Sequence, residues 1–419
     1  MNTRMNKNKF HIGAYLLQQN ARTEEHIRDI AECGLDLIVC LNLVRNESGT
    51  GYDTGVLDLF SRYGLGCIVS GVLPGWWGGD GERAGDLCRV NPLSAYETAA
   101  ASFSDHPAVW GIDMGDEPSA LDFPYYGKVT ETVNRIFPNR FGYLNLYPNY
   151  ASVAGNSGEQ TRNQLGTATY AEYIESYVKH VPTDYICFDF YLYSLRDLPR
   201  MYENLRIISD ACRRTGRAFW YVPQVNSSRE EETTSENRLR FQAFTAMAYG
   251  AVCLFWACWC GGWWYHNVLD GEGNRTEQYG KLKTVNADIR RIAEEYMKYR
   301  NVSTDLIGFD TDDSMGRYSD ELLPSLSVGS FSGVRGENGE KLAVGYMKAK
   351  NGKGDALMIA ASDDPYDENN REVIVVFRSD CPDLRAFGTD GGDPLTKEAD
   401  GSYRLRLRSC GGALVTAEP

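Results

Sequence analysis

Eight short apolar runs recur over about the first 300 residues, and a segment with helical spacing of its apolar side chains follows each run. Nearly continuous apolar runs of this length are typical of parallel strands that are buried on both faces. The pattern predicts strands at His11–Leu16, Leu35–Leu41, Cys67–Leu73, Val109–Met114, Phe141–Leu146, Tyr185–Tyr191, Phe219–Val225 and Val252–Trp256.

Helix start and stop signals lie between these runs. Thr23 precedes a helical stripe that Gly34 ends, Gly216 ends the stripe after the sixth run, and Ser235 can cap the helix after the seventh. Strands and helices that alternate eight times are the pattern of a (β/α)8 TIM barrel rather than of an open doubly wound sheet. The first strand also lacks the GxGxxG of a dinucleotide site.

The pattern changes after about Val302. Short alternating runs, such as those at Leu342–Met347, Val373–Phe377 and Tyr403–Leu407, are separated by Gly, Asn and Asp turns. They predict a small all-β, antiparallel sandwich. We therefore expect a barrel domain at residues 1–302 and a β-sandwich domain at residues 303–419.

Composition narrows the classes of partner. The chain of 419 residues has a formal net charge of −14 and no basic cluster, so we expect no nucleic acid and no anionic membrane surface as partner. No apolar run approaches the length of a membrane span, so no membrane insertion is expected. Met1–Lys9 lacks the apolar stretch of a secretory signal, which favours a cytoplasmic protein as given; removal of a leader would leave export open.

Most of the eleven cysteines lie in apolar runs, where Cys acts as a small hydrophobe, and this mildly favours a reducing compartment. Cys258 and Cys260 can begin a metal site, but no CxxC pair or His cluster accompanies them. We expect no metal and no cofactor. The sequence does not indicate an oligomeric state.

The most specific segment ends the fourth strand and reads Gly115-Asp116-Glu117-Pro118. It resembles clan A glycoside hydrolases and their barrel relatives, in which Asn-Glu-Pro or Asp-Glu-Pro ends strand four. The resemblance implies that Glu117 is the general acid that protonates the departing glycosidic oxygen, as a poor alkoxide leaving group requires. The alternative is that Asp116 and Glu117 cap the following helix.

A second carboxylate is needed, and the resemblance does not supply it. Clan A enzymes carry a nucleophilic Glu at the end of strand seven, where this chain has Gln224. Asp189, at the end of strand six, is either a base or nucleophile or a structural acceptor. Asp116 beside Glu117 also resembles the Asp-Glu pair of hexosaminidases, in which a substrate acetamido group attacks. A third source is the run Glu230-Glu231-Glu232, which otherwise is a solvated loop.

Aromatic and neutral polar side chains gather at the predicted strand ends. Flat apolar faces with polar edges suit sugar rings, although several of the aromatic residues can equally be packing residues. The expected substrate-binding residues are Trp76, Trp77, Asn145, Tyr147, Tyr191, Gln224, Trp256, Trp259, Trp263 and His266.

The resemblance extends to the helix at Phe241–Gly250, to the aromatic eighth strand and to the C-terminal β domain. The chain is similar to polysaccharide-degrading hydrolases of the kind that gut Bacteroidetes encode. This resemblance implies a glycoside hydrolase that cleaves O-glycosidic bonds of a carbohydrate substrate. Two alternatives stay open, a noncatalytic glycan-binding barrel and a substrate-assisted N-acetylhexosaminidase that uses Asp116 and Glu117.

Overall fold

The computed structural model describes residues 5–45, 51–77, 83–101, 103, 105–151, 164–309, 322–366, 368–369, 371–388 and 391–418. Part of the N-terminal stretch Met1–Lys9 therefore lies outside the described residues. The chain forms two compact units. The first contains Met1–Lys7, His11–Glu232 and Cys253–Tyr279, and the second Asn8–Phe10, Thr233–Val252 and Gly280–Pro419. The division at residues 302 and 303 stays a prediction.

The eight predicted strands form one parallel sheet with the order β5-β4-β3-β2-β1-β8-β7-β6. Each strand lies within a few residues of its predicted position, so the barrel prediction is confirmed. Their bounds are β1 His11–Tyr15, β2 Leu37–Asn42, β3 Gly66–Ser70, β4 Val109–Asp116, β5 Phe141–Asn145, β6 Tyr185–Asp189, β7 Ala218–Val222 and β8 Ala251–Trp256.

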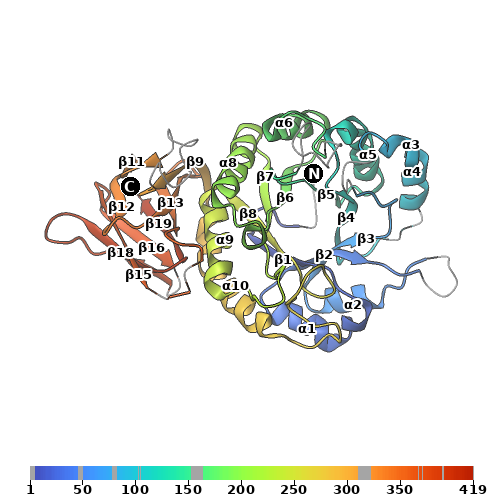
Figure 1. Cartoon of the computed structure of the whole chain (residues 1–419), viewed down its shortest axis with the longest axis horizontal. Coiled ribbons are helices and arrows are strands. Elements are labelled where there is room, and N and C mark those ends of the chain that lie inside the picture. The colour runs from blue at the N-terminus through green and yellow to red at the C-terminus, as the bar shows by residue number, and fades with distance from the viewer. Residues whose placement is uncertain are drawn as a thin grey trace. The chain divides into compact units, whose positions relative to one another are not determined.

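The ring closes between the two ends of this strand order. A parallel bridge pairs Leu146, just after β5, with Phe188 of β6, and the amide of Leu146 donates to the carbonyl of Cys187 at 2.9 Å. Figure 1 shows the strands as a ring with helices outside it. Because all strands run in the same direction, their C-terminal ends open on one mouth.

The barrel interior is filled by aromatic side chains. The ring of Tyr185 stacks on that of Trp220 with centroids 3.9 Å apart, and Trp220 contacts Phe141 and Phe255 edge to face. The rings of Tyr143 and Tyr185 are stacked, with their centroids 6.3 Å apart. Side chains from β5 to β8 thus fill the barrel below the mouth, and only the strand ends are free to carry a site.

The helices of the first unit begin and end where the sequence signals predict. Thr23 caps α1 with a capping box, and Gly216 ends α8 with a φ of 72°. The helical elements are η1 Gln19–Ala21, α1 Glu24–Glu32, α2 Gly55–Arg62, α3 Leu87–Val90, α4 Leu93–Ala101, η2 Ala120–Asp122, α5 Phe123–Ile136, α6 Tyr170–His180, α7 Leu192–Leu195 and α8 Leu198–Thr215.

The second unit contains two helices and two sheets. The hydroxyl of Ser235 caps α9, as predicted. The helices are α9 Glu236–Ala248 and α10 Glu277–Tyr296, and the strands are β9 Tyr299–Ile307, β10 Leu322–Leu323, β11 Leu326–Val328, β12 Phe331–Gly336, β13 Leu342–Ala349, β14 Asp355–Ala361, β15 Glu372–Ser379, β16 Asp383–Gly388, β17 Gly391–Pro394, β18 Tyr403–Arg408 and β19 Gly412–Glu418.

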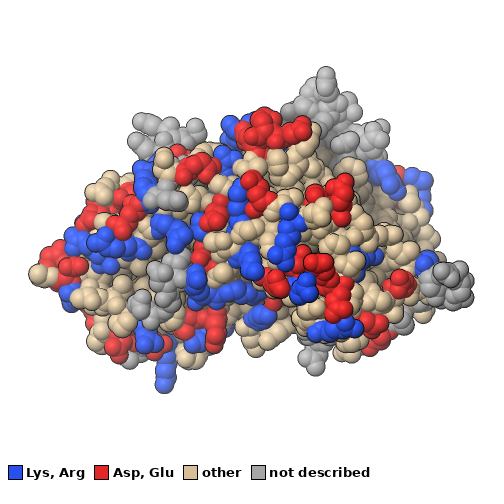
Figure 2. Space-filling model, turned by 90° about the horizontal axis from the view of Figure 1, so that it is seen from below, with Lys and Arg blue, Asp and Glu red and all other residues tan. Residues whose placement is uncertain are grey.

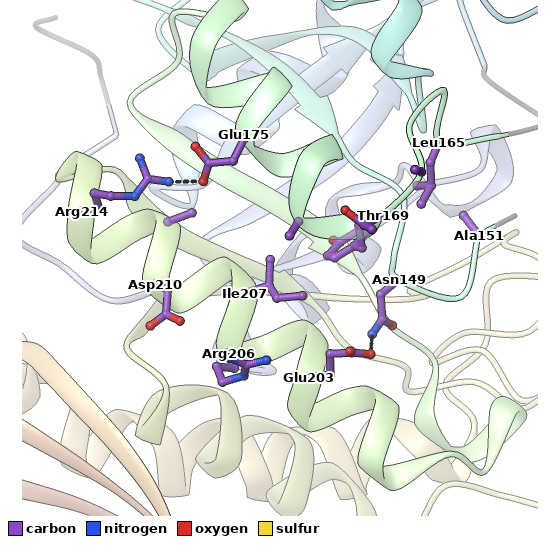
Figure 3. Close-up of a pocket in the computed structure, with 14 residues that line it drawn as sticks. Asn149, Ala151, Leu165, Thr169, Glu175, Glu203, Arg206, Ile207, Asp210 and Arg214 are labelled. Atoms are coloured by element: carbon purple, nitrogen blue, oxygen red, sulfur yellow. Dashed lines mark hydrogen bonds and ion pairs between the residues drawn. The ribbon is translucent and has the colours of Figure 1, made fainter. Parts of the chain in front are cut away.

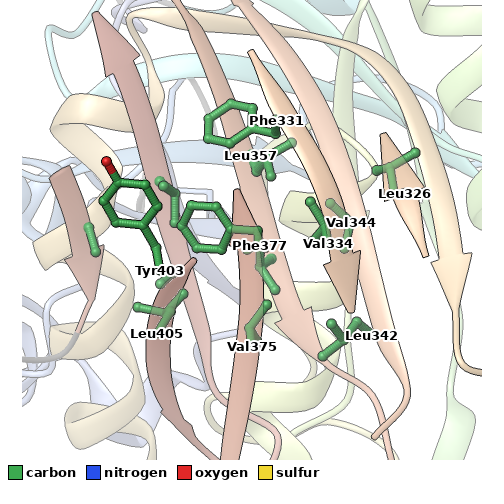
Figure 4. Close-up of a cluster of buried hydrophobic side chains, with 14 of the residues drawn as sticks. Leu326, Phe331, Val334, Leu342, Val344, Leu357, Val375, Phe377, Tyr403 and Leu405 are labelled. Atoms are coloured by element: carbon green, nitrogen blue, oxygen red, sulfur yellow. The ribbon is translucent and has the colours of Figure 1, made fainter. Parts of the chain in front are cut away.

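The two sheets form the predicted sandwich. One sheet has the order β10-β9-β13-β14-β19-β16-β17 and the other β11-β12-β15-β18, and the pairings are antiparallel except that of β9 with β10. Figure 4 shows the apolar core, in which Phe377 lies between Phe331 and Tyr403 with centroids 6.0 and 5.7 Å away. Within this unit α9 packs on the larger sheet, and Asn301 of β9 donates to the carbonyl of Ala248 at 2.9 Å.

Charge is distributed without a dominant sign on the face that Figure 2 shows, where acidic and basic side chains are interspersed. In the described part of the chain, no helix is both long and apolar enough to cross a bilayer.

Candidate active site

The end of β4 has an unusual backbone that turns two carboxyls into the barrel mouth. Its pairing with β5 shifts register between Asp113 and Gly115, and such bulges re-aim the side chains that follow. Gly115 has a φ of 144°, and a Cβ there would meet the Tyr126 hydroxyl and the Trp76 carbonyl. Glu117 has a φ of 45°, a conformation that is uncommon for a residue with a side chain and that is enriched at active sites.

Neither carboxyl serves as the cap of the following helix. The hydroxyl of Ser119 accepts from the Leu121 amide at 3.4 Å and caps η2 instead. The side chains of Asp116 and Glu117 make their hydrogen bonds to Asn145 and Trp77. The capping alternative therefore does not describe this strand end.

Asn145, the last residue of β5, contacts all three candidate carboxyl residues. Its side-chain nitrogen donates to Asp189 Oδ1 at 2.7 Å and to Asp116 Oδ1 at 3.2 Å. Its backbone carbonyl accepts from the Glu117 amide at 2.9 Å. The structure thus brings the three predicted catalytic residues around one amide side chain, at the ends of β4, β5 and β6.

The protein environment favours the neutral form of each carboxyl. Burial raises the pKa of Glu117 well above its usual range, and the charges of Asp189 and Asp116 raise it further. Burial and the charge of Asp116 raise the pKa of Asp189 to about 7. Burial also raises the pKa of Asp116, to about 6, while hydrogen bonds from the Asn145 side chain and the Glu117 amide lower it. Burial and two neighbouring negative charges therefore favour the protonated form of Glu117.

A hydrogen-bonded network lies beneath these carboxyls. The Cys187 thiol donates to Asn145 Oδ1 at 3.5 Å and contacts the Tyr143 hydroxyl at 3.4 Å, and Tyr143 in turn bonds Tyr15. Cys187, Tyr143 and Tyr15 are not among the predicted site residues, because Tyr and Cys in buried strands are typical packing residues.

Two further groups near the carboxyls were not among the predicted site residues. Asp113 accepts from the Gly115 amide at 3.0 Å and from the Cys40 thiol at 3.8 Å, and burial raises its pKa to about 7. Tyr150 donates a hydrogen bond that lowers the pKa of Asp189. The sequence offered one signal for each residue: Asp113 is a charged residue inside an apolar run, and Tyr150 follows a strand end.

Gln224 lies at the position where clan A enzymes carry their nucleophile, and it is only 1% exposed. Its Oε1 accepts from the amides of Tyr193 and Ser194 at 3.0 and 3.3 Å. Its Nε2 donates to the Asn226 carbonyl at 2.9 Å. The side chain fastens the end of β7 to α7, so its polar atoms are occupied by protein partners.

The loop after β7 is held by protein contacts. Glu232 forms ion pairs with Arg196 at 2.5 Å and Arg229 at 2.9 Å, and Glu230 and Glu231 are exposed. His266 donates from Nε2 to the Glu230 carbonyl at 2.6 Å, which joins this loop to the one after β8. His266 is thus a link between two loops at the mouth.

Of the predicted substrate-binding aromatic residues, Trp77 and Trp263 are exposed and Tyr191 is half-buried; Trp264, which is not among the predicted residues, is exposed as well. Trp77 is 58% exposed and its indole N–H donates to Glu117 Oε2 at 3.1 Å. Trp263 is 38% exposed, and it meets the half-buried ring of Tyr191 edge to face at 6.0 Å. Trp264, equally exposed, lies 5.1 Å from Tyr191. These rings offer faces to a ligand.

The remaining predicted aromatic residues are covered by protein. Trp256 and Trp259 are fully buried, and Tyr147 packs on Tyr173 with centroids 6.3 Å apart. Trp76 is buried with the guanidinium of Arg83 4.2 Å from its ring. They have no free face for stacking, and we leave them out of the proposed substrate site.

A cavity of about 550 Å³ lies elsewhere, between α6 and α8 (Figure 3). Glu175 pairs with Arg214 across it, and Asn149 donates to Glu203 at 2.9 Å. None of the predicted site residues lines this cavity. Among the described residues no group of three or more His, Cys, Asp or Glu side chains has the arrangement of a metal site.

Comparisons with known proteins give a likeness of fold. No family model matches the chain, and no curated protein matches it. Similar solved structures include a glucosidase from Croceicoccus marinus, with 10% identity, a TM-score of 0.44 and coverage of 98% of this chain and 96% of that one. Another is a family 5 glycoside hydrolase mannosidase from Rhizomucor miehei, with 12% identity, a TM-score of 0.44 and coverage of 68% and 93%. A Bacteroides fragilis protein described as a candidate α-galactosidase has 11% identity, a TM-score of 0.49 and coverage of 98% and 80%.

Proposed function

We propose that this protein is a glycoside hydrolase that cleaves O-glycosidic bonds, with Glu117 as the general acid. The observation that carries the proposal is the convergence of Glu117, Asp116 and Asp189 on Asn145 at the mouth of the barrel. Glycoside hydrolysis needs one protonated and one ionised carboxyl on either side of the scissile bond. Burial and the charges of Asp189 and Asp116 raise the pKa of Glu117 well above its usual range, which supports Glu117 as the protonated partner.

In this proposal each group has one task. Glu117 gives its proton to the glycosidic oxygen as the bond to the anomeric carbon breaks. Asp189, ionised and held by Asn145 and Tyr150, is the second carboxylate, either attacking the anomeric carbon or activating a water. Trp77 lies beside the acid, and Tyr191, two residues after Asp189, contacts Trp263 and Trp264. These four side chains bind sugar rings by stacking.

A second candidate is substrate-assisted cleavage of an N-acetylhexosaminide. Asp116 precedes Glu117, keeps open surface and is held in place by Asn145, so it can orient an acetamido group. In that reaction the acetamido oxygen attacks the anomeric carbon, and Asp189 is a structural acceptor. The two candidates differ in whether the cleaved sugar must carry an acetamido group.

The test is sugar release from a panel of plant and host polysaccharides and of aryl glycosides with and without a 2-acetamido group. Wild type is compared with Glu117→Gln and with Glu97→Gln, a surface control whose ion pair with Arg135 lies outside the mouth. We expect release that only Glu117→Gln abolishes. Binding of glycans by all three proteins without any release would instead establish the noncatalytic barrel that Gln224 leaves open.

A further inference from the structure

The amide of Asn145 has an orientation that its surroundings fix. Two carboxylate oxygens face one end of the group and the Cys187 thiol faces the other. An NH2 group has two hydrogens and an amide oxygen has none, so only the nitrogen can face both carboxylates. A flipped amide would place three oxygens together. Both hydrogens of Asn145 are therefore committed to Asp116 and Asp189, and the residue cannot donate to a sugar hydroxyl while these bonds last.

The double hydrogen bond holds two like charges near each other. Because a single nitrogen bonds both oxygens, at 3.2 and 2.7 Å, these oxygens lie no more than about 6 Å apart. Two carboxylates at this distance repel each other, and each is disfavoured by burial. Asn145 is itself buried, in the strand between those that carry the two acids, so it cannot swing away.

No cation offsets the repulsion in the described part of the chain. Apart from one another, the titratable groups whose charges interact with those of these carboxyls are one further acid, two thiols and several phenols, and none is a Lys or Arg. They are Tyr15 of β1, Cys40 of β2, Asp113 of β4, Cys187 of β6, Tyr221 of β7, Tyr126 of α5, Tyr170 and Tyr173 of α6, and Tyr150 and Tyr191 of the loops.

We infer that Asn145 is a positioning residue that keeps Asp116 and Asp189 ionised together and, through their charges, keeps Glu117 protonated. This role rests on the proposed function. Asn145 accordingly does not act on substrate, in contrast to the hydroxyl-binding role that the sequence predicts for it. Its hydrogen bonds lower the pKa of both aspartates, against burial, and the charges that they preserve raise the pKa of Glu117.

The inference predicts a specific change when the hydrogen bonds are removed. In Asn145→Leu, which keeps the size of the side chain, both aspartates lose a donor and their pKa values rise by about one unit. Glu117 then faces less negative charge, and its pKa falls. The bell-shaped pH profile of kcat/KM therefore becomes narrower: its acid limb moves to higher pH and its alkaline limb moves to lower pH.

Asn204→Leu is the matched control, because Asn204 is a fully buried amide of α8 whose hydrogen bonds go to Tyr170 and the Asn149 amide and not to any of the three carboxyls. Both variants lose a buried amide, so a loss of stability alone affects them alike. Only Asn145→Leu should narrow the profile. Asn145→Ser, whose single hydroxyl hydrogen can serve one carboxylate, is the second variant if the Leu variant does not fold.

The decisive readout needs no substrate. Carboxyl carbons of wild type, Asn145→Leu, Asn145→Ser and Asn204→Leu are titrated by NMR, with Asp116→Asn and Asp189→Asn for assignment. Higher pKa values of Asp116 and Asp189 in the Asn145 variants, but not in Asn204→Leu, would support the inference. This holds even if no form of the protein released sugar and the proposed function failed. If Asp116 and Asp189 had the same pKa values in the Asn145 variants as in the wild type, the inference would be overturned, even if the wild type proved to be an active glycosidase.

Discussion

The indole N–H of Trp77 donates to Oε2 of Glu117 at 3.1 Å, while more than half of the Trp77 side chain remains open to solvent. One residue therefore both adjusts the protonation of the proposed acid and offers a ring face next to it. This hydrogen bond favours the ionised form of Glu117 and lowers its pKa, against the larger opposing effects of burial and of the two aspartates.

Trp77→Phe should separate the two roles, because it keeps an aromatic ring and removes the donor. The pKa of Glu117 rises, so the alkaline limb of the pH profile moves up by about one unit. Trp77→Ala should add an increase in KM through loss of the ring. The profiles are measured on one aryl glycoside, and an unmoved alkaline limb in Trp77→Phe would show that the hydrogen bond does not act on the catalytic acid.

Gln224→Glu should not restore a nucleophile, although it recreates the residue that the clan A pattern expects. A carboxylate cannot donate to the Asn226 carbonyl, and it would be buried without a counter-ion. We expect a loss of about 2 kcal/mol in the free energy of unfolding, measured with urea, and no gain in rate. A faster enzyme would show instead that position 224 faces the substrate.

Gly115→Ala should disable the site through the backbone. Both the φ of 144° and the approach of the Trp76 carbonyl and the Tyr126 hydroxyl exclude a side chain at this position. We expect a loss of stability of about 2 kcal/mol or more, together with at least a tenfold loss of kcat/KM. Gly216→Ala is the control, since Gly216 also has a positive φ, 72°, but open space around its Cβ position. Equal losses of activity in both variants would contradict this account.

Asp189→Asn should stabilise the fold at high pH. The pKa of Asp189 is about 7 in the folded protein, above the value of about 3.9 expected for an unfolded chain, so the folded state binds more protons between these values. Its contribution to stability therefore falls as the pH rises through this window. The variant should be more stable than wild type at pH 8, on the order of a few kcal/mol, with a difference that shrinks toward pH 4. Equal unfolding curves at both pH values would show that Asp189 is not held in this environment.

The sequence predicted the barrel and the sandwich because buried strands and helix caps leave local signals. Thr23, Gly216 and Ser235 act at the positions where their side chains or conformations are required. The pattern placed the end of β4 at Met114, whereas the strand runs to Asp116 through a bulge that apolar spacing does not encode.

The site was less accessible to sequence reasoning, because its geometry depends on neighbouring strands. Alternation could not tell that Trp256 and Trp259 are enclosed while Trp263 is open. Nor could it show that one nitrogen of Asn145 joins the acids of β4 and β6, since that contact spans 44 residues on one side and 29 on the other.

The central claim is that Glu117 protonates the leaving group, and its most direct test is the dependence of rate on the leaving group. Wild type and Glu117→Ala are compared on aryl glycosides whose phenols range from weakly to strongly acidic. An acidic phenol departs without a proton, so the variant should lose about 100- to 10,000-fold on the poorest leaving group and little on the best. A uniform loss across the series, or none, would contradict the assignment of Glu117 as the general acid.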